Sequence, residues 1–198
     1  MINIPFTSEH RLDLIQLAIK KTNARDYLEI GCDKNQIFSN INVKNKIGVD
    51  PARGGTLRMT SDDFFKNNKE KFDVVFVDGL HYYDQVKRDV ENSLNVLKEN
   101  GIIVIHDMLP KNKLHAEVPI PNPFRKPWLG DVWRLGFDLM ARSDIVFHIV
   151  KIDSGCGILW KGKQSSIDLN PINSWDFYTA NYNNLPLISF EDIVGKLD

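Results

Sequence analysis

Apolar residues along this chain gather in short, nearly uninterrupted runs. Four runs, at residues 26–30, 46–50, 72–78 and 102–105, have the length of β-strands and few polar interruptions, which is typical of strands buried on both faces. Residues 56–60 form a weaker candidate, but the loop of about five residues before it is too short for a crossover helix. That segment is either a short strand or an irregular edge of the sheet.

Between the runs, apolar residues recur with the period of an α-helix. One such stripe places Val86, Val90, Leu94 and Leu97 on one helix face and is expected to stop at Asn100. A weaker amphipathic stretch precedes the second run. The predicted helices start at Ser8 as N-cap, Ser61 as N-cap, Tyr82, Gly130, Asn173 and Ser189.

Strand, helix and strand over residues 72–105 form a β–α–β unit, in which the two strands are parallel. Further along, residues 144–152 and 157–161 flank a tight turn and predict an antiparallel hairpin. The predicted fold class is therefore α/β: a mostly parallel sheet with helices on both faces and an antiparallel β-hairpin toward the C-terminus.

Residues 108–129 differ from the rest of the chain because they contain five prolines and show no apolar period. A structureless segment of that length is usually a lid or a binding loop. Trp128 and Trp133 at its end are either core residues or a platform for a ligand. The 198 residues are expected to form one domain, with a core at 24–161 and a helical extension at 170–198.

Composition and charge narrow the classes of function. Lys and Arg together number 25 against 26 Asp and Glu, a net charge of −1, so no basic field favours a nucleic acid as partner. The first residues show no signal-peptide pattern, and no run approaches the ~20 apolar residues that span a bilayer. Cys32 and Cys156 are expected to be packing residues. We expect a soluble, cytoplasmic protein with no nucleic-acid or membrane partner, and the sequence leaves open whether it forms a homodimer.

Polar residues mark the ends of two predicted strands. Asp78 and His81 follow one strand, and His106 and Asp107 follow the next. The ligand crevice of an open parallel sheet lies outside the carboxyl ends of its strands. These four side chains are therefore expected to converge on one active site.

Two further acids flank the first predicted turn. Glu29 lies just before Gly31, and Asp50 ends the next strand about 20 residues later, a spacing suited to one strand–turn–helix–strand unit. Either acid alone is explained by bonds to turn amides, whereas the pair favours a ligand site. Because the turn has one glycine, Asp33 and Asn35 must take the left-handed conformations that glycine usually supplies.

These features together resemble the class I S-adenosylmethionine-dependent methyltransferases over residues 24–161. Residues 48–65, followed by 77–81 and 104–107, are more specifically similar to small bacterial enzymes related to the macrocin and sugar O-methyltransferases, some of which require a divalent metal. The resemblance implies a Rossmann-like fold, S-adenosylmethionine as cofactor, and methyl transfer to a hydroxyl of a small molecule or glycan precursor. Segment 108–129 is then the loop that selects the acceptor.

The resemblance also implies roles for single residues. Gly31 lets the backbone approach the methionine part of the cofactor, while Glu29 binds turn amides or the cofactor's ammonium group. Asp50 accepts both ribose hydroxyls. The adenine edge meets residues 61–62, and Phe64 meets its face. The implied cofactor-binding residues are Glu29, Gly31, Asp50, Ser61, Asp62 and Asp78.

The expected catalytic residues are His81, His106 and Asp107. His81 suits a general base because imidazole titrates near working pH, and the alternative is a surface cap at the start of a helix. With Asp78, the pair His106 and Asp107 offers oxygen and imidazole ligands to a divalent ion, magnesium or manganese before zinc. The alternative is that both are ordinary polar residues at a strand end.

Two other functions compete with methyl transfer. A nicotinamide-dependent oxidoreductase requires Gly-x-Gly-x-x-Gly after the first strand, and residues 31–36 lack its second and third glycines. A non-catalytic binding module on the same fold is compatible with the sparse glycines of the turn.

Overall fold

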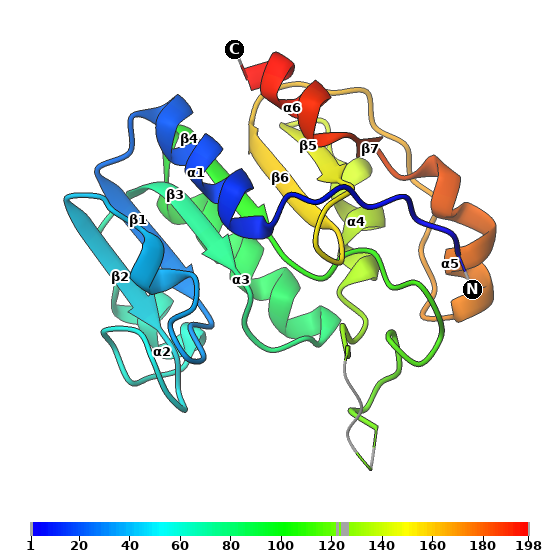
Figure 1. The fold of residues 1–198 in the computed structure, drawn as a ribbon, viewed down its shortest axis with the longest axis horizontal. Coiled ribbons are helices and arrows are strands. Elements are labelled where there is room, and N and C mark those ends of the chain that lie inside the picture. The colour runs from blue at the N-terminus through cyan, green and yellow to red at the C-terminus, as the bar shows by residue number, and fades with distance from the viewer. Residues whose placement is uncertain (1, 122, 124–126, 198) are drawn as a thin grey trace.

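A computed structural model of the chain describes residues 2–121, 123 and 127–197. Within these residues seven strands form one sheet in the order β2-β1-β3-β4-β6-β5-β7, which runs from left to right in Figure 1. β1 is parallel to β2 and β3, β3 to β4, and β5 to β7, whereas β6 is antiparallel to β4 and β5. The strands are β1 (Asp26–Ile30), β2 (Asn45–Val49), β3 (Phe72–Val77), β4 (Leu97–Ile105), β5 (Ile145–Val150), β6 (Cys156–Lys161) and β7 (Leu187–Ile188).

Helices cover both faces of the sheet, because successive strand residues point to opposite faces and both sets are apolar. In β1, Tyr27 packs in one hydrophobic cluster and Leu28 in the other. One face carries α1 (Arg11–Thr22), the 3₁₀ turn Phe38–Asn40 and α6 (Phe190–Leu197); the other carries α2 (Ser61–Asn67), α3 (Tyr83–Val96), α4 (Trp133–Met140) and α5 (Trp175–Asn181). The predicted α/β class with a mostly parallel sheet, helices on both faces and an antiparallel hairpin is confirmed. None of the helices in the described ranges is long and apolar enough to cross a lipid bilayer.

Two helices begin at other caps than predicted. The N-cap of α1 is His10 and not Ser8, since the His10 ring accepts a hydrogen bond from the Leu12 amide and Asp13 accepts one from the His10 amide. The N-cap of α2 is Thr60, whose hydroxyl accepts from the amide of residue 63 at 3.1 Å. Ser61 therefore lies in the first turn, where its side chain is free for other contacts.

The end of α3 was predicted wrongly. The helix ends at Val96, and Leu97 pairs with Phe72 of β3 as the first residue of β4. The register shifts before Val74 pairs with Ile102, so the residues between Leu97 and Ile102 form an irregularity in the strand. Leu97 has the spacing of the helical stripe, but it is buried as a residue of strand β4 and not as part of the helix.

The structure also differs from the sequence-based expectation, or decides between alternatives, at three short segments. Residues 56–60 make only an isolated bridge, between Leu57 and Val49, so this stretch is the irregular sheet edge and not a strand. The amphipathic stretch at 36–41 contains one 3₁₀ turn instead of an α-helix. β7 was not predicted; its two residues extend the sheet beyond the hairpin, between the two C-terminal helices.

The order of the strands changes direction at β1: the chain passes from β1 to β2 on one side, and after β2 it crosses back to β3 on the other side of β1. A crevice forms at such a switch point. Gly31 has φ +84°, and a Cβ on it would overlap the carbonyl group of Asp78. Asp33 and Asn35 have φ of 43° and 62°, which confirms the left-handed conformations predicted for this turn.

Replacing Gly31 by Ala is expected to lower the free energy of unfolding by at least about 2 kcal/mol, since an L-residue is strained at this φ and its Cβ meets backbone. The matched control is Gly195→Ala in α6, where a Cβ meets nothing within 4 Å. That change should raise the unfolding free energy by about 0.5–1 kcal/mol through helix propensity. Urea denaturation measures both, and equal effects of the two substitutions would contradict the contact.

Candidate functional site

A cavity of about 740 Å³ opens at the carboxyl ends of β1, β3 and β4. Apart from Phe64, every residue predicted for a cofactor or a catalytic role lines it, although the residues come from five segments of the chain. These residues are Glu29, Gly31, Asp50, Ser61, Asp62, Asp78, His81, His106 and Asp107. The cavity wall also includes polar side chains that sequence reasoning missed, among them Arg11, Gln85 and Asp89.

Asp50 holds the first turn in place. One carboxylate oxygen accepts from the amides of Cys32 and Asp33, both at 3.0 Å, and the other accepts from the amides of Ala52 and Arg53, both at 2.8 Å. Burial opposes its charge, but these four amides outweigh burial and lower its pKa. A carboxylate has about four acceptor positions. The structure therefore shows Asp50 in the alternative role of satisfying turn amides.

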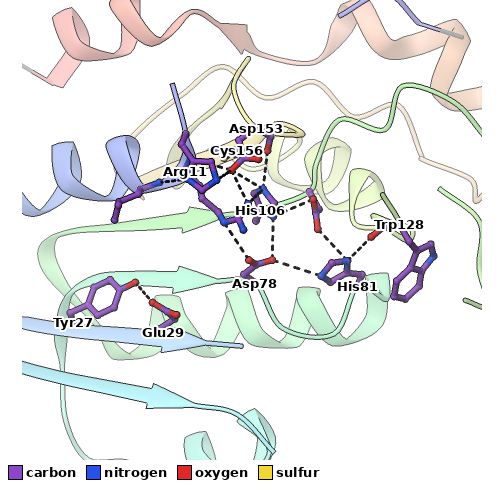
Figure 2. A network of polar contacts seen from close by, with 12 residues as sticks. Arg11, Tyr27, Glu29, Asp78, His81, His106, Trp128, Asp153 and Cys156 are labelled. Carbon is purple, nitrogen blue, oxygen red and sulfur yellow. Dashed lines mark hydrogen bonds and ion pairs between the residues drawn. The ribbon is translucent and has the colours of Figure 1, made fainter. Parts of the chain in front are cut away.

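Glu29 is buried beside the cavity, with 1% of its surface exposed. The Tyr27 hydroxyl donates to its Oε2 at 2.6 Å, as Figure 2 shows. Burial raises the pKa of Glu29 to about 7, against the lowering effect of the Tyr27 hydrogen bond. Glu29 is therefore a carboxyl group poised to gain or lose a proton when a charged group binds next to it.

The wall opposite the first turn is built from α2 and α3. The Gln85 amide nitrogen lies within hydrogen-bond distance of Ser61, Asp62 and Asp89, at 3.2, 3.2 and 3.1 Å. Asp89 is buried, and burial raises its pKa. Phe64, by contrast, packs in the core against Phe65 and Phe72 and does not line the cavity.

His106 lies in a ring of acidic groups. Its Nδ1 is 3.2 Å from carboxylate oxygens of both Asp78 and Asp107, and its Nε2 is 2.8 Å from the Asp153 carbonyl oxygen and 3.0 Å from Arg11 Nη1. Burial disfavours a charge on this ring, but Asp107 and Asp78 outweigh burial and raise the pKa of His106 well above its ordinary value. Both ring nitrogens then donate, so His106 is a buried cation that balances the carboxylates (Figure 2).

Asp78 lies at the centre of this network. Burial opposes its ionisation, but His106, His81 and Arg11 outweigh burial and lower its pKa. Asp153, in the turn between β5 and β6, accepts from Arg11 Nη1 at 2.7 Å. Sequence reasoning missed Arg11 and Asp153, because nothing in the local pattern signals that α1 and the hairpin turn meet at the end of β4.

His81 lies between the two strand ends and the proline-rich segment. Its Nδ1 is 3.1 Å from Asp107 Oδ2 and 3.1 Å from the Trp128 carbonyl oxygen, and its Nε2 is 3.7 Å from Asp78 Oδ1. The ring stacks on Trp128, with centroids 5.3 Å apart. Both neighbours of Nδ1 are acceptors, so the hydrogen-bond network assigns the ring proton to Nδ1 and the lone pair to Nε2. His81 is not the N-cap of α3, which is Tyr82.

A set of metal-ligating groups is present, but its histidine is not the expected one. Among the described residues, Asp78, His81 and Asp107 each offer one ligand atom, and the three atoms lie within 4.8 Å of one another. His106 was expected in this set. It is instead held by Asp153 and by hydrogen bonds that it donates to the carboxylates, so it has no lone pair for a metal.

The predicted lid, residues 108–129, is only partly a loop at the surface. Met108 and Leu109 are fully buried, and Trp128 lies on His81. Residues 122 and 124–126 of this segment lie outside the described part of the chain. Trp133 is a core residue, buried against Phe137 and Tyr178.

Comparison with known proteins places this site in context. Residues 16–108 match a family model described as a methyltransferase domain. This match covers β1 to β4 and ends just beyond His106 and Asp107. A search of the curated proteins finds no match.

Several solved structures share the fold at low sequence identity. An O-methyltransferase from Bacillus cereus, in complex with S-adenosylhomocysteine, is 13% identical over 79% of this chain and 82% of that chain, with a TM-score of 0.53. The O-methyltransferase TomG from Streptomyces achromogenes, in complex with S-adenosylmethionine, is 15% identical over 78% and 81%, with a TM-score of 0.53. The methyltransferase MycE from the mycinamycin pathway, in complex with Mg, S-adenosylhomocysteine and mycinamycin VI, is 15% identical over 89% and 56%, with a TM-score of 0.52.

The raised pKa of Glu29 predicts a pH dependence of stability. Its folded pKa of about 7 lies above its ordinary value of 4.5, so the folded state binds more protons between these values and stability falls as pH rises through this window. From about pH 5 to about pH 8, the wild type should lose about 2–3 kcal/mol more unfolding free energy than Glu29→Gln, which keeps an acceptor for Tyr27. Urea denaturation at the two pH values measures this, and parallel losses in both proteins would contradict it.

Proposed function

We propose that this chain is a class I S-adenosylmethionine-dependent methyltransferase and that it transfers the cofactor's methyl group to a hydroxyl of a small molecule or glycan precursor. One observation carries the proposal: Asp78, His81 and Asp107 face the same cavity as the Glu29–Gly31 turn. A methyl donor held by the turn and an acceptor held by the strand ends then meet in one crevice.

The residues of the first turn fit the cofactor's amino-acid part. Gly31 has no Cβ and lies against the Asp78 backbone, so this part of the wall is backbone that a ligand can approach closely. Glu29, with its pKa near 7, becomes fully ionised when an ammonium group binds beside it. Asp78 adds a second carboxylate at the strand end. S-adenosylmethionine, when bound, supplies the methyl group on its sulfonium.

The adenosine end of the cofactor is assigned to the wall formed by α2 and α3. Ser61 and Asp62 begin α2 and line the cavity, together with Gln85. The two oxygens of Asp50 already bind four loop amides. Ribose recognition by Asp50 therefore requires that its hydroxyls share the carboxylate with these amides, and the turn that Asp50 holds is the larger part of its contribution.

Proton removal from the acceptor is assigned to His81. In its neutral form the Nδ1 proton is held by the Asp107 carboxylate and the Trp128 carbonyl, so Nε2 has a lone pair to accept the hydroxyl proton. Asp107 then stabilises the imidazolium that forms. Its backbone has φ +63°, a conformation that Asp tolerates and that is common at functional sites. Catalysis otherwise consists of alignment of acceptor oxygen and methyl group.

The same three residues fit a divalent ion. Two carboxylates and one imidazole with ligand atoms within 4.8 Å of one another suit magnesium or manganese, whose preferred ligands are oxygens. Asp78, His81 and Asp107 would hold the ion, and its charge would lower the pKa of an acceptor hydroxyl. His81 would then use its Nε2 lone pair for ligation, so the roles of base and ligand exclude each other.

Binding of S-adenosylhomocysteine tests the cofactor assignment. Isothermal titration calorimetry should give saturable binding of this product and no binding of NAD, because the turn at 31–36 lacks the glycines that a dinucleotide requires. Tight NAD binding without S-adenosylhomocysteine binding would establish an oxidoreductase instead. Binding of neither would favour a non-catalytic module.

Replacing His81 by Ala should lower turnover by at least about tenfold and leave the affinity for S-adenosylhomocysteine unchanged, since the ring contacts Asp107 and Trp128 and not the first turn. Turnover is measured as product formed from a panel of hydroxyl acceptors. Wild-type turnover that survives EDTA assigns His81 as the base. Turnover that EDTA abolishes and magnesium or manganese restores assigns it as a ligand, and unchanged turnover in His81→Ala refutes both roles.

A further inference from the structure

Arg11 is a charged side chain of the cavity to which the proposed reaction assigns no role. It is the first residue of α1, on the face of the sheet opposite α3, and its guanidinium reaches over the ends of β3 and β4 (Figure 2). It lines the same cavity as Gly31 and Asp78. The residues matched by the family model begin at residue 16, so Arg11 lies outside that match.

The hydrogen bonds of Arg11 leave part of the guanidinium unused. Nη1 donates to Asp153 Oδ2 at 2.7 Å and lies 3.0 Å from His106 Nε2. Nε is buried, and no described residue accepts a hydrogen bond from it. The carboxylate of Asp78 lies 3.7 Å from Nε, which is an ion-pair distance but too long for a hydrogen bond. No hydrogen bond joins Nη2 to a described residue, and Nη2 is not among the fully buried atoms, so it is the donor that a ligand in the cavity can reach.

The chemistry of the unused donor selects its partner. Arginine presents its N–H groups as a planar fork that matches the two oxygens of a carboxylate. We infer that Arg11 binds the α-carboxylate of the methionine part of S-adenosylmethionine, an inference that rests on the proposed function. The ligand carboxylate then accepts from Nη2, which has no hydrogen-bond partner among the described residues, while the fully buried Nε stays beside Asp78.

The charges around Arg11 favour the amino-acid end of the cofactor over a simple anion. Asp78, Asp107 and Asp153 surround Arg11 and His106, so this end of the cavity already has more carboxylates than cations. A ligand with only a negative charge would increase this excess of negative charge. An amino acid is a zwitterion, and its ammonium group is attracted by the same carboxylates while its carboxylate takes the guanidinium.

Arg53 is the other arginine in the described cavity wall, and it already forms an ion pair with Asp33. Arg53 follows Asp50, is mostly exposed, and binds the Asp33 carboxylate. Its place beside the Asp50 loop is the side assigned to the nucleoside. Of the two arginines that line the described cavity wall, Arg11 is the one next to Asp78.

A ligand that differs only in the carboxylate tests this inference. Decarboxylated S-adenosylhomocysteine, 5′-(3-aminopropylthio)-5′-deoxyadenosine, keeps the nucleoside, the thioether and the amine. By calorimetry, wild-type protein should bind S-adenosylhomocysteine at least about tenfold more tightly than this analogue, a ratio typical of a charge-assisted hydrogen bond. Arg11→Gln should bring the ratio close to one, mainly by weakening S-adenosylhomocysteine. A wild-type ratio near one, or an unchanged ratio in Arg11→Gln, overturns the inference.

Two further variants separate this outcome from a structural effect. Arg142→Gln removes an arginine that also bonds two carboxylates, on Glu91 and Asp144, but that does not line the cavity, and it should keep the wild-type ratio. Arg11→Lys keeps the charge and loses the fork, so it should lower the ratio at least about threefold even if Arg11→Gln fails to fold; an unchanged ratio overturns the inference. If neither nucleoside ligand binds the wild type, the proposed function itself fails.

Discussion

The balance of charge around Asp78 is the constraint on which this site depends. Three carboxylates, those of Asp78, Asp107 and Asp153, come together at the ends of β3, β4 and β5. They are tolerated in a partly buried place because His106 is held as a cation among them and Arg11 reaches in from α1. Buried charges are stable only when they are paired in this way. The network thus ties four separate elements to one point of the sheet.

The two histidines of this network have different hydrogen-bond partners. His106 has carboxylates at Nδ1, and at Nε2 both the Asp153 carbonyl oxygen and Arg11 Nη1, and the carboxylates raise its pKa and favour its charged form. His81 has acceptors at Nδ1 and faces Asp78 with Nε2 at a longer distance, which leaves a lone pair for chemistry. Two similar side chains near two strand ends therefore differ in their hydrogen bonds because of the partners that the fold provides.

The first turn, which follows β1, forms with a single glycine. Gly31 is required where the turn touches the end of β3, while Asp33 and Asn35 take left-handed conformations at the cost that short polar side chains tolerate. Asp50 offsets that cost, since its carboxylate accepts hydrogen bonds from amides of the turn and of the next loop. The acid at the end of β2 is thus first a stabiliser of the loop, and any contact with ribose is made by a carboxylate already bonded to protein.

The sequence by itself determined the fold class, the four parallel strands, and the meeting of Glu29, Asp50, Asp78, His81, His106 and Asp107 at one edge. It could do so because strands that are buried on both faces appear in the sequence as apolar runs, and because parallel strands end at a common edge of the sheet. Tertiary structure alone decided the rest: that Leu97 joins β4, that Asp50 serves loop amides, that His81 and not His106 completes the metal-ligand set, and that Arg11 enters the cavity. Each of these features depends on contacts between segments that are distant in the sequence, such as α1 and the β5–β6 turn. Local periodicity contains no information about such contacts.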